Sequence, residues 1–218
     1  MLKRKVVFIA LTALLLCSCA ATRYSSGVSA STARPMALVE PYSEILFLPE
    51  KGDFVEDSRN SELSQELLSS IVKLNCPGVE SVINRGDAFG RELSSIANVK
   101  IKKLEWTKVA PGICELLRKS GYRYGVLVYA TGFTRDDKGF MKSAIGGALL
   151  GIATAVLTLG MVSVYGVSYK YASNVYIMVV DAQTDKVVYY DKSTINGEDP
   201  VSFNGLKRQV KRILKHFK

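Results

Sequence analysis

The sequence predicts an α+β fold: one small domain in which helices pack on a mixed sheet. Three observations predict this fold. Several stretches place apolar residues at helical spacing, others alternate and are rich in Val and Tyr, and their order is strand, helix, strand, helix, three strands and helix. A chain of 218 residues commonly builds a single core.

The amino terminus has the pattern of an export signal. Residues 3–5 are basic, and residues 6–16 form an apolar run that is shorter than a bilayer span. We therefore expect residues 1–18 to be a signal peptide that is removed. Its loss lowers the formal charge from +9 to about +6. The alternative is an uncleaved membrane anchor, which the shortness of the apolar run disfavours.

Cys19 lies where a lipid would be attached. Leu16 precedes it by three positions and Ser18 by one, and this arrangement resembles the lipobox of bacterial lipoproteins. Cys17 departs from the usual small or hydroxylated residue, but acylation of Cys17 would place bulky Leu16 directly before the cut. We therefore predict lipidation at Cys19, with several acyl chains holding the protein on a membrane.

Residues 19–40 are mostly small and polar, so we expect a lipidated flexible tether there and an α/β domain over residues 41–218. The domain is predicted to begin with a strand over 43–48, which Pro49 stops. A helix capped by Asn60 or Ser61 follows and ends before Pro77. Its apolar positions recur at helical spacing: Leu63, Leu67, Leu68, Ile71, Val72 and Leu74.

The remaining elements follow in order. We expect a short strand over 79–83, a helical piece over 89–96, and a helix that starts at Pro111 and stops at Gly121. Three β segments then cover 122–133, 167–181 and 187–194, the last two joined as a hairpin.

The last element is predicted to be an amphipathic basic helix. Its apolar residues, 206, 210, 213, 214 and 217, fall on one face. The cations on the other face form either a solvated surface or one that meets anionic headgroups. They are Lys207, Arg208, Lys211, Arg212 and Lys215.

Three local runs resemble a group of bacterial envelope lipoproteins. They are residues 43–49, a strand ending in proline; residues 119–128, a helix end running into a central strand; and residues 175–190, a closing hairpin. This arrangement resembles the α/β domain of the TolB amino terminus, of penicillin-binding-protein activators and of the curli-secretion lipoprotein. The resemblance covers residues 43–217 in order, and it implies an envelope lipoprotein.

The chain departs from that group through an apolar insertion, residues 143–169, which carries no charge and is expected to be helical. A single membrane crossing would place two neighbouring strands on opposite sides of the bilayer. Three readings remain: a helical hairpin dipping into the membrane, an oligomer contact, or packing against the sheet. The contact positions would be Ala144, Gly147, Ala148, Gly151, Leu157 and Leu159.

The sequence offers little for catalysis or metal binding. His216 is the only histidine, so a positioned base for a nucleophile is lacking, and we expect no enzyme activity, no cofactor and no metal. Asp136 and Asp137 are typical of a turn. Cys76 and Cys114 could pair in an oxidising compartment or be buried as small apolar residues.

These observations predict a non-catalytic scaffold or assembly lipoprotein of the cell envelope. Its partners would be the membrane, through the lipid, and an envelope protein or a second copy. We expect no nucleic acid, because export disfavours it. Ala20 lacks the acidic character that retains some lipoproteins in the inner membrane, so we expect the outer membrane, facing the periplasm. The alternatives are a carrier of a lipid or other hydrophobic ligand and, less favoured, an envelope hydrolase.

Overall fold

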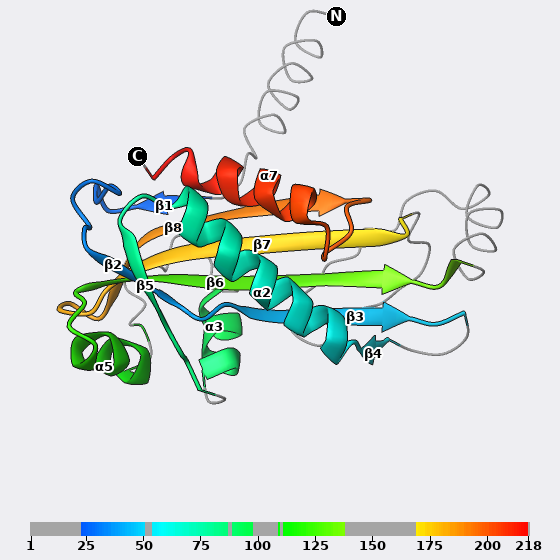
Figure 1. Cartoon of the computed structure of the whole chain (residues 1–218), viewed down its shortest axis with the longest axis horizontal. Coiled ribbons are helices and arrows are strands. Elements are labelled where there is room, and N and C mark those ends of the chain that lie inside the picture. The colour runs from blue at the N-terminus through cyan, green and yellow to red at the C-terminus, as the bar shows by residue number, and fades with distance from the viewer. Residues whose placement is uncertain are drawn as a thin grey trace, which may run out of the picture.

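The computed structural model describes residues 23–50, 54–86, 89–97, 109, 111–137 and 169–217. In these ranges, eight strands form one mixed sheet with helices on both faces (Figure 1), so the predicted fold class is confirmed. The strands are β1 Tyr24–Ser25, β2 Met36–Val39, β3 Tyr42–Leu48, β4 Val55–Glu56, β5 Val79–Ile83, β6 Tyr124–Arg135, β7 Tyr171–Asp181 and β8 Lys186–Asn196. The helices are α2 Ser58–Asn75, α3 Gly90–Ala97, α5 Pro111–Lys119 and α7 Phe203–Leu214.

The long antiparallel strands β6, β7 and β8 form the middle of the sheet. β6 pairs with β7 from Tyr124 opposite Asp181 to Thr134 opposite Tyr171, and β7 continues into β8 through a tight turn. On the other side of β6, β2 and β3 run parallel to it one after the other. Pro41 lies in the break between β2 and β3, a position that tolerates a residue without a backbone N–H.

The predicted tether is wrong for residues 24–40, which belong to the domain. β2 lies between β5 and β6, and all four of its residues are buried. Ala30 and Ala33 are buried as well, and β1 pairs with the outer side of β8. Small side chains made this stretch look like a linker, whereas here they allow close packing. A four-residue strand is also too short to show a period.

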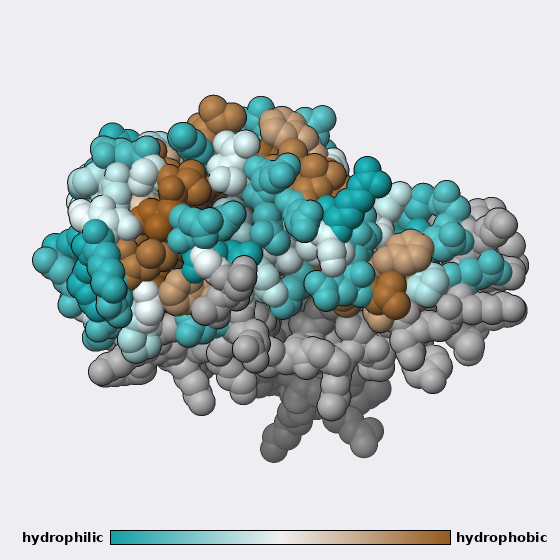
Figure 2. Space-filling view, turned by 60° about the horizontal axis from the view of Figure 1, so that its bottom comes forward, coloured by the Kyte–Doolittle hydropathy of each residue, from teal (hydrophilic) through white to brown (hydrophobic). Residues whose placement is uncertain are grey.

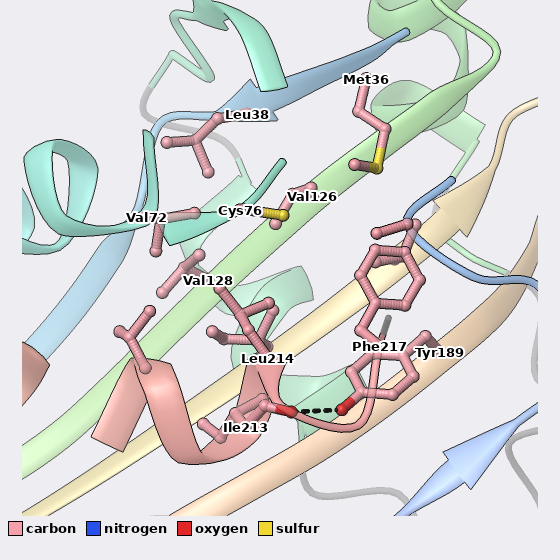
Figure 3. Close-up of a cluster of buried hydrophobic side chains, with 14 of the residues drawn as sticks. Met36, Leu38, Val72, Cys76, Val126, Val128, Tyr189, Ile213, Leu214 and Phe217 are labelled. Atoms are coloured by element: carbon pink, nitrogen blue, oxygen red, sulfur yellow. Dashed lines mark hydrogen bonds between the residues drawn. The ribbon is translucent and has the colours of Figure 1, made fainter. Parts of the chain in front are cut away.

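Two cores lie on opposite faces of the sheet. On one face, α2 and α7 cover Val126, Val128 and Ile177; on the other, α3 and α5 cover Leu127 and Met178. Figure 3 shows part of the first core, where the Tyr189 hydroxyl donates to the Ile213 carbonyl at 2.6 Å. This bond fixes the end of α7 against β8.

The start of α2 also differs from the expected cap. Asp57, rather than Asn60 or Ser61, caps the helix by accepting from the Asn60 N–H at 3.1 Å. Ser61 is buried, and its Oγ accepts from the Ile45 N–H at 2.9 Å. The serine that looked like a cap therefore joins α2 to β3.

Candidate functional site

The two ends of the described chain meet at one edge of the sheet. Tyr24 of β1 pairs with Tyr190 of β8, and the Ala30 N–H donates to the Phe217 carbonyl at 2.6 Å. Figure 1 accordingly shows β1 beside β8, with the carboxyl end of α7 close by. The first described residues therefore lie next to the carboxyl end of α7.

The predicted basic residues lie on α7, but they have different surroundings. Arg208 is paired with Glu198, and the half-buried Lys207 lies over the ring of Phe203. Lys211, Arg212 and Lys215 are exposed in the last turns of the helix and at its end. No carboxylate of the described ranges forms an ion pair with these last three.

Asp191 of β8 connects the free cations to the amino-terminal end of the chain. Its side chain is buried, and burial raises its pKa. The hydrogen bond that its carboxylate accepts from the Lys192 N–H at 2.8 Å lowers the pKa. The charges of Arg23, His216 and Arg212 also act to lower that pKa. The pairing of Tyr24 with Tyr190 puts Arg23 beside Asp191 at this edge, and the bond from Tyr189 to the Ile213 carbonyl holds the end of α7 against β8. The basic edge, defined as Arg23, Lys211, Arg212, Lys215 and His216, thus combines two ends of the sequence.

The chain between Cys19 and this edge is short. Cys19 itself lies outside the described residues, but only residues 20–22 separate it from Arg23. Four residue steps span at most about 14 Å when fully extended. Lipid on Cys19 would therefore keep the basic edge close to the membrane surface.

The apolar insertion leaves the sheet at the opposite end. Its six predicted contact residues, from Ala144 to Leu159, lie outside the described residues. Its flanks are described, and Thr134 of β6 lies opposite Tyr171 of β7. Met178 of β7 pairs with Tyr190 of β8, which in turn pairs with Tyr24 of β1. From Tyr171 to Met178, β7 advances about 23 Å, so the insertion and β1 are separated by about that distance along the strand. In the described ranges, no helix is long and apolar enough to cross a membrane.

The two cysteines are free and lie in different cores. Cys76 is buried with α2 and α7, and Cys114 is buried on the α3 and α5 face. The bond that the sequence left open is not formed, because the sheet separates the two side chains. Burial raises the pKa of Cys76 to about 11 and that of Cys114 to about 12.

A tyrosine cluster on the α3 and α5 face was missed by the sequence reasoning. The hydroxyls of Tyr42 and Tyr129 both donate to the Glu44 carboxylate, Tyr129 packs on Tyr176, and the Arg85 guanidinium lies over the Tyr42 ring. Burial and Glu44 raise the pKa of Tyr42. The parallel register of β3 and β6, which sequence alone does not give, brings these residues together.

Other polar residues singled out in the sequence have structural partners. Asp137 forms an ion pair with Lys170, and the Asp136 N–H donates to the Leu48 carbonyl. Within the described ranges, no three His, Cys, Asp or Glu side chains gather to hold a metal ion. On the side shown in Figure 2, apolar side chains lie in small groups among hydrophilic ones, as is usual for a protein surface.

Comparison with known proteins gives distant structural similarities. No protein family profile and no curated protein sequence matches the chain. Among solved structures, the PelC dodecamer from Paraburkholderia phytofirmans is 11% identical, with 88% of this chain and 92% of that chain covered and a TM-score of 0.42. The LpoB C-terminal domain from Salmonella enterica is 11% identical, with 79% and 87% covered and a TM-score of 0.33. Lipoprotein GNA1162 from Neisseria meningitidis is 15% identical, with 73% and 81% covered and a TM-score of 0.27.

Proposed function

We propose that this chain is a lipid-anchored, non-catalytic scaffold or assembly component of the bacterial cell envelope, held at the outer membrane and facing the periplasm. The observation that carries the proposal is the placement of two features at opposite ends of the same strands. The lipid-bearing terminus joins the domain beside β8, and the uncharged insertion leaves it about 23 Å away along β7.

The anchor follows from the sequence before the domain. Each buried lipid methylene contributes about 0.8 kcal/mol, so several acyl chains on Cys19 hold the protein on the membrane almost permanently. Because Tyr24 is already part of the sheet, the domain lies next to the bilayer and does not hang from a long linker. The absence of an acidic residue after Cys19 favours the outer membrane.

The insertion supplies the surface for a partner. Because β6 and β7 are antiparallel neighbours, both flanks of the segment emerge at the same end of the sheet, which disfavours a single membrane crossing. Because the insertion leaves the sheet far from the anchored edge, contact with a protein is favoured over insertion into the leaflet that holds the lipid. Gly147 and Gly151, with Ala144 and Ala148 beside them, suit the close approach of two helices.

The use of polar groups supports a non-catalytic role. Ser43 and Ser64 bond to each other between β3 and α2, and Ser173 bonds to Gln209 between β7 and α7. His216 lies exposed at the carboxyl end of α7. These polar side chains join elements of the domain or face solvent, and none is arranged as nucleophile and base.

Light scattering on the unlipidated chain from Ala20 tests the scaffold reading. We expect a defined oligomer for the intact chain, and a folded monomer when residues 143–169 are replaced by a short Gly/Ser linker, because Thr134 and Tyr171 are already neighbours. Gly147→Leu combined with Gly151→Leu serves as the point variant and should also dissociate the oligomer.

A photo-crosslinker at Leu157 in cells extends the test to other envelope proteins. An adduct with a second copy or with one envelope protein is the expected outcome. If the intact chain is monomeric, gives no adduct and unfolds when the segment is replaced, the segment is core and the proposal fails. A monomer that carries extractable lipid would instead support the carrier alternative.

A further inference from the structure

We propose that the basic edge binds the anionic phospholipid headgroups of the membrane that holds the lipid anchor, so that the domain is docked on the surface in one orientation. The inference rests on the proposed anchor at Cys19 for its geometry, and it assigns a ligand class, anionic phospholipid, to this edge. Its energetic basis is separate from acylation and can be measured without it.

The first argument is the state of the cations. Lys211, Arg212 and Lys215 are exposed and form no ion pair with a described carboxylate, whereas Arg208, one turn earlier, is paired with Glu198. Unpaired cations on a rigid helix can approach phosphate groups without first breaking an internal salt bridge. The carboxyl end of α7 therefore differs from its beginning.

The second argument is the position of the nearby acids. Glu198 and Asp199 lie before the first turn of α7 and are engaged there, Glu198 with Arg208 and Asp199 with the Val201 N–H. Asp191, on which the charges of Arg23, Arg212 and His216 act, is buried and not exposed at the surface. A membrane approaching this end therefore meets exposed positive charge.

The third argument is distance. Arg23 contributes to the basic edge and is four residues from Cys19, so its Cα lies within about 14 Å of the acylated residue. Charges act on an anionic surface over about 8 Å at physiological ionic strength. The anchor thus keeps Arg23 within about two such screening lengths of the acylated residue.

Vesicle binding of the unlipidated chain from Ala20 tests the proposal. Cosedimentation is measured with phosphatidylcholine vesicles and with vesicles that also contain phosphatidylglycerol. A cation near such a surface contributes about 1 kcal/mol, which is roughly fivefold in binding. We expect Lys211→Gln, Arg212→Gln and Lys215→Gln together to reduce binding to the anionic vesicles on the order of 100-fold.

The matched control removes three cations from other exposed sites: Arg59→Gln, Lys73→Gln and Lys119→Gln, on α2 and α5. It has the same net charge as the α7 variant, and we expect it to keep most of the binding. Circular dichroism checks that both variants are folded. Loss of wild-type binding when salt is raised gives a second readout that needs no variant.

Equal binding to neutral and anionic vesicles would overturn the proposal and assign the attachment to the apolar insertion. An equal loss in the two variants would also overturn it, because only net charge would then matter. Neither result concerns acylation of Cys19 or the oligomer, which are measured in separate experiments. Failure of this inference is therefore distinguishable from failure of the proposed function.

Discussion

At the scale of single residues, the two thiols of the mature domain are held in apolar surroundings. Burial raises the pKa of Cys76 to about 11 and of Cys114 to about 12, so both are protonated near neutral pH. Because the thiolate is the reactive form, we predict that neither thiol reacts with Ellman's reagent in the folded chain from Ala20 and that both react in denaturant. Fast reaction of either thiol before unfolding would contradict the packing described here.

Gln209 is a buried polar residue between α7 and β7. Its Nε2 donates to the Ser173 carbonyl at 2.9 Å, and its Oε1 accepts from the Ser173 hydroxyl at 3.1 Å. Gln209→Ala removes both bonds to Ser173 and opens a cavity. We predict that it lowers the free energy of unfolding by about 2–4 kcal/mol in urea denaturation.

Ser173→Ala is the matched control for that change. It removes the hydroxyl but keeps the backbone carbonyl that Gln209 bonds, so a smaller loss of about 1 kcal/mol is expected. If Gln209→Ala were no more damaging than this control, the pair would not join α7 to the sheet.

At the scale of elements, an ion pair holds the β7–β8 turn against the start of β6. Burial raises the pKa of Asp181, but its bonds from Arg123 and from the Gln183 N–H outweigh that rise, so the pKa lies below its ordinary value. A lowered folded-state pKa stabilises the fold above the unfolded value of about 3.9. That stabilisation is lost as the pH falls through the folded-state pKa.

We therefore predict that the wild-type chain loses stability between about pH 5 and pH 2 more steeply than Asp181→Asn. Urea midpoints measured across this range give the comparison. A slope unchanged by Asp181→Asn would show that this carboxyl does not contribute to the acid sensitivity.

The elements differ in how well the sequence predicts them. Helical spacing located α2 and α7, and alternation located β6 to β8, to within a few residues, because long elements show a clear period. Three strands are too short to show a period: β1 and β4 have two residues each, and β2 has four. Their place depends on partners far along the chain, as in β2 between β5 and β6.

The candidate site was predictable only in part. The cations of α7 are visible in the sequence as one face of a helix, but their closeness to Arg23 depends on β1 pairing with β8. The difference between the paired Arg208 and the unpaired Lys211 likewise depends on where Glu198 lies. The tyrosine cluster around Glu44 required the register of β3 on β6.

At the scale of the whole molecule, the sheet separates the two ends to which the proposed function assigns roles. β1, β8 and the carboxyl end of α7 form the end beside the proposed lipid site, and the apolar insertion lies between β6 and β7 in the sequence, at the other end. Because the first strand begins only five residues after Cys19, a lipid on Cys19 would leave the domain little freedom to move away from the membrane. An anchored domain of this kind can present the insertion at a fixed height.

The mass of the mature amino-terminal peptide, measured on protein extracted from fractionated envelopes, tests the central claim most directly. The account predicts a chain that begins at Cys19, carries acyl groups and sediments with the outer membrane, and a Cys19→Ala chain that gains no acyl mass. A wild-type chain that begins elsewhere, or that lacks acyl groups, would contradict the account.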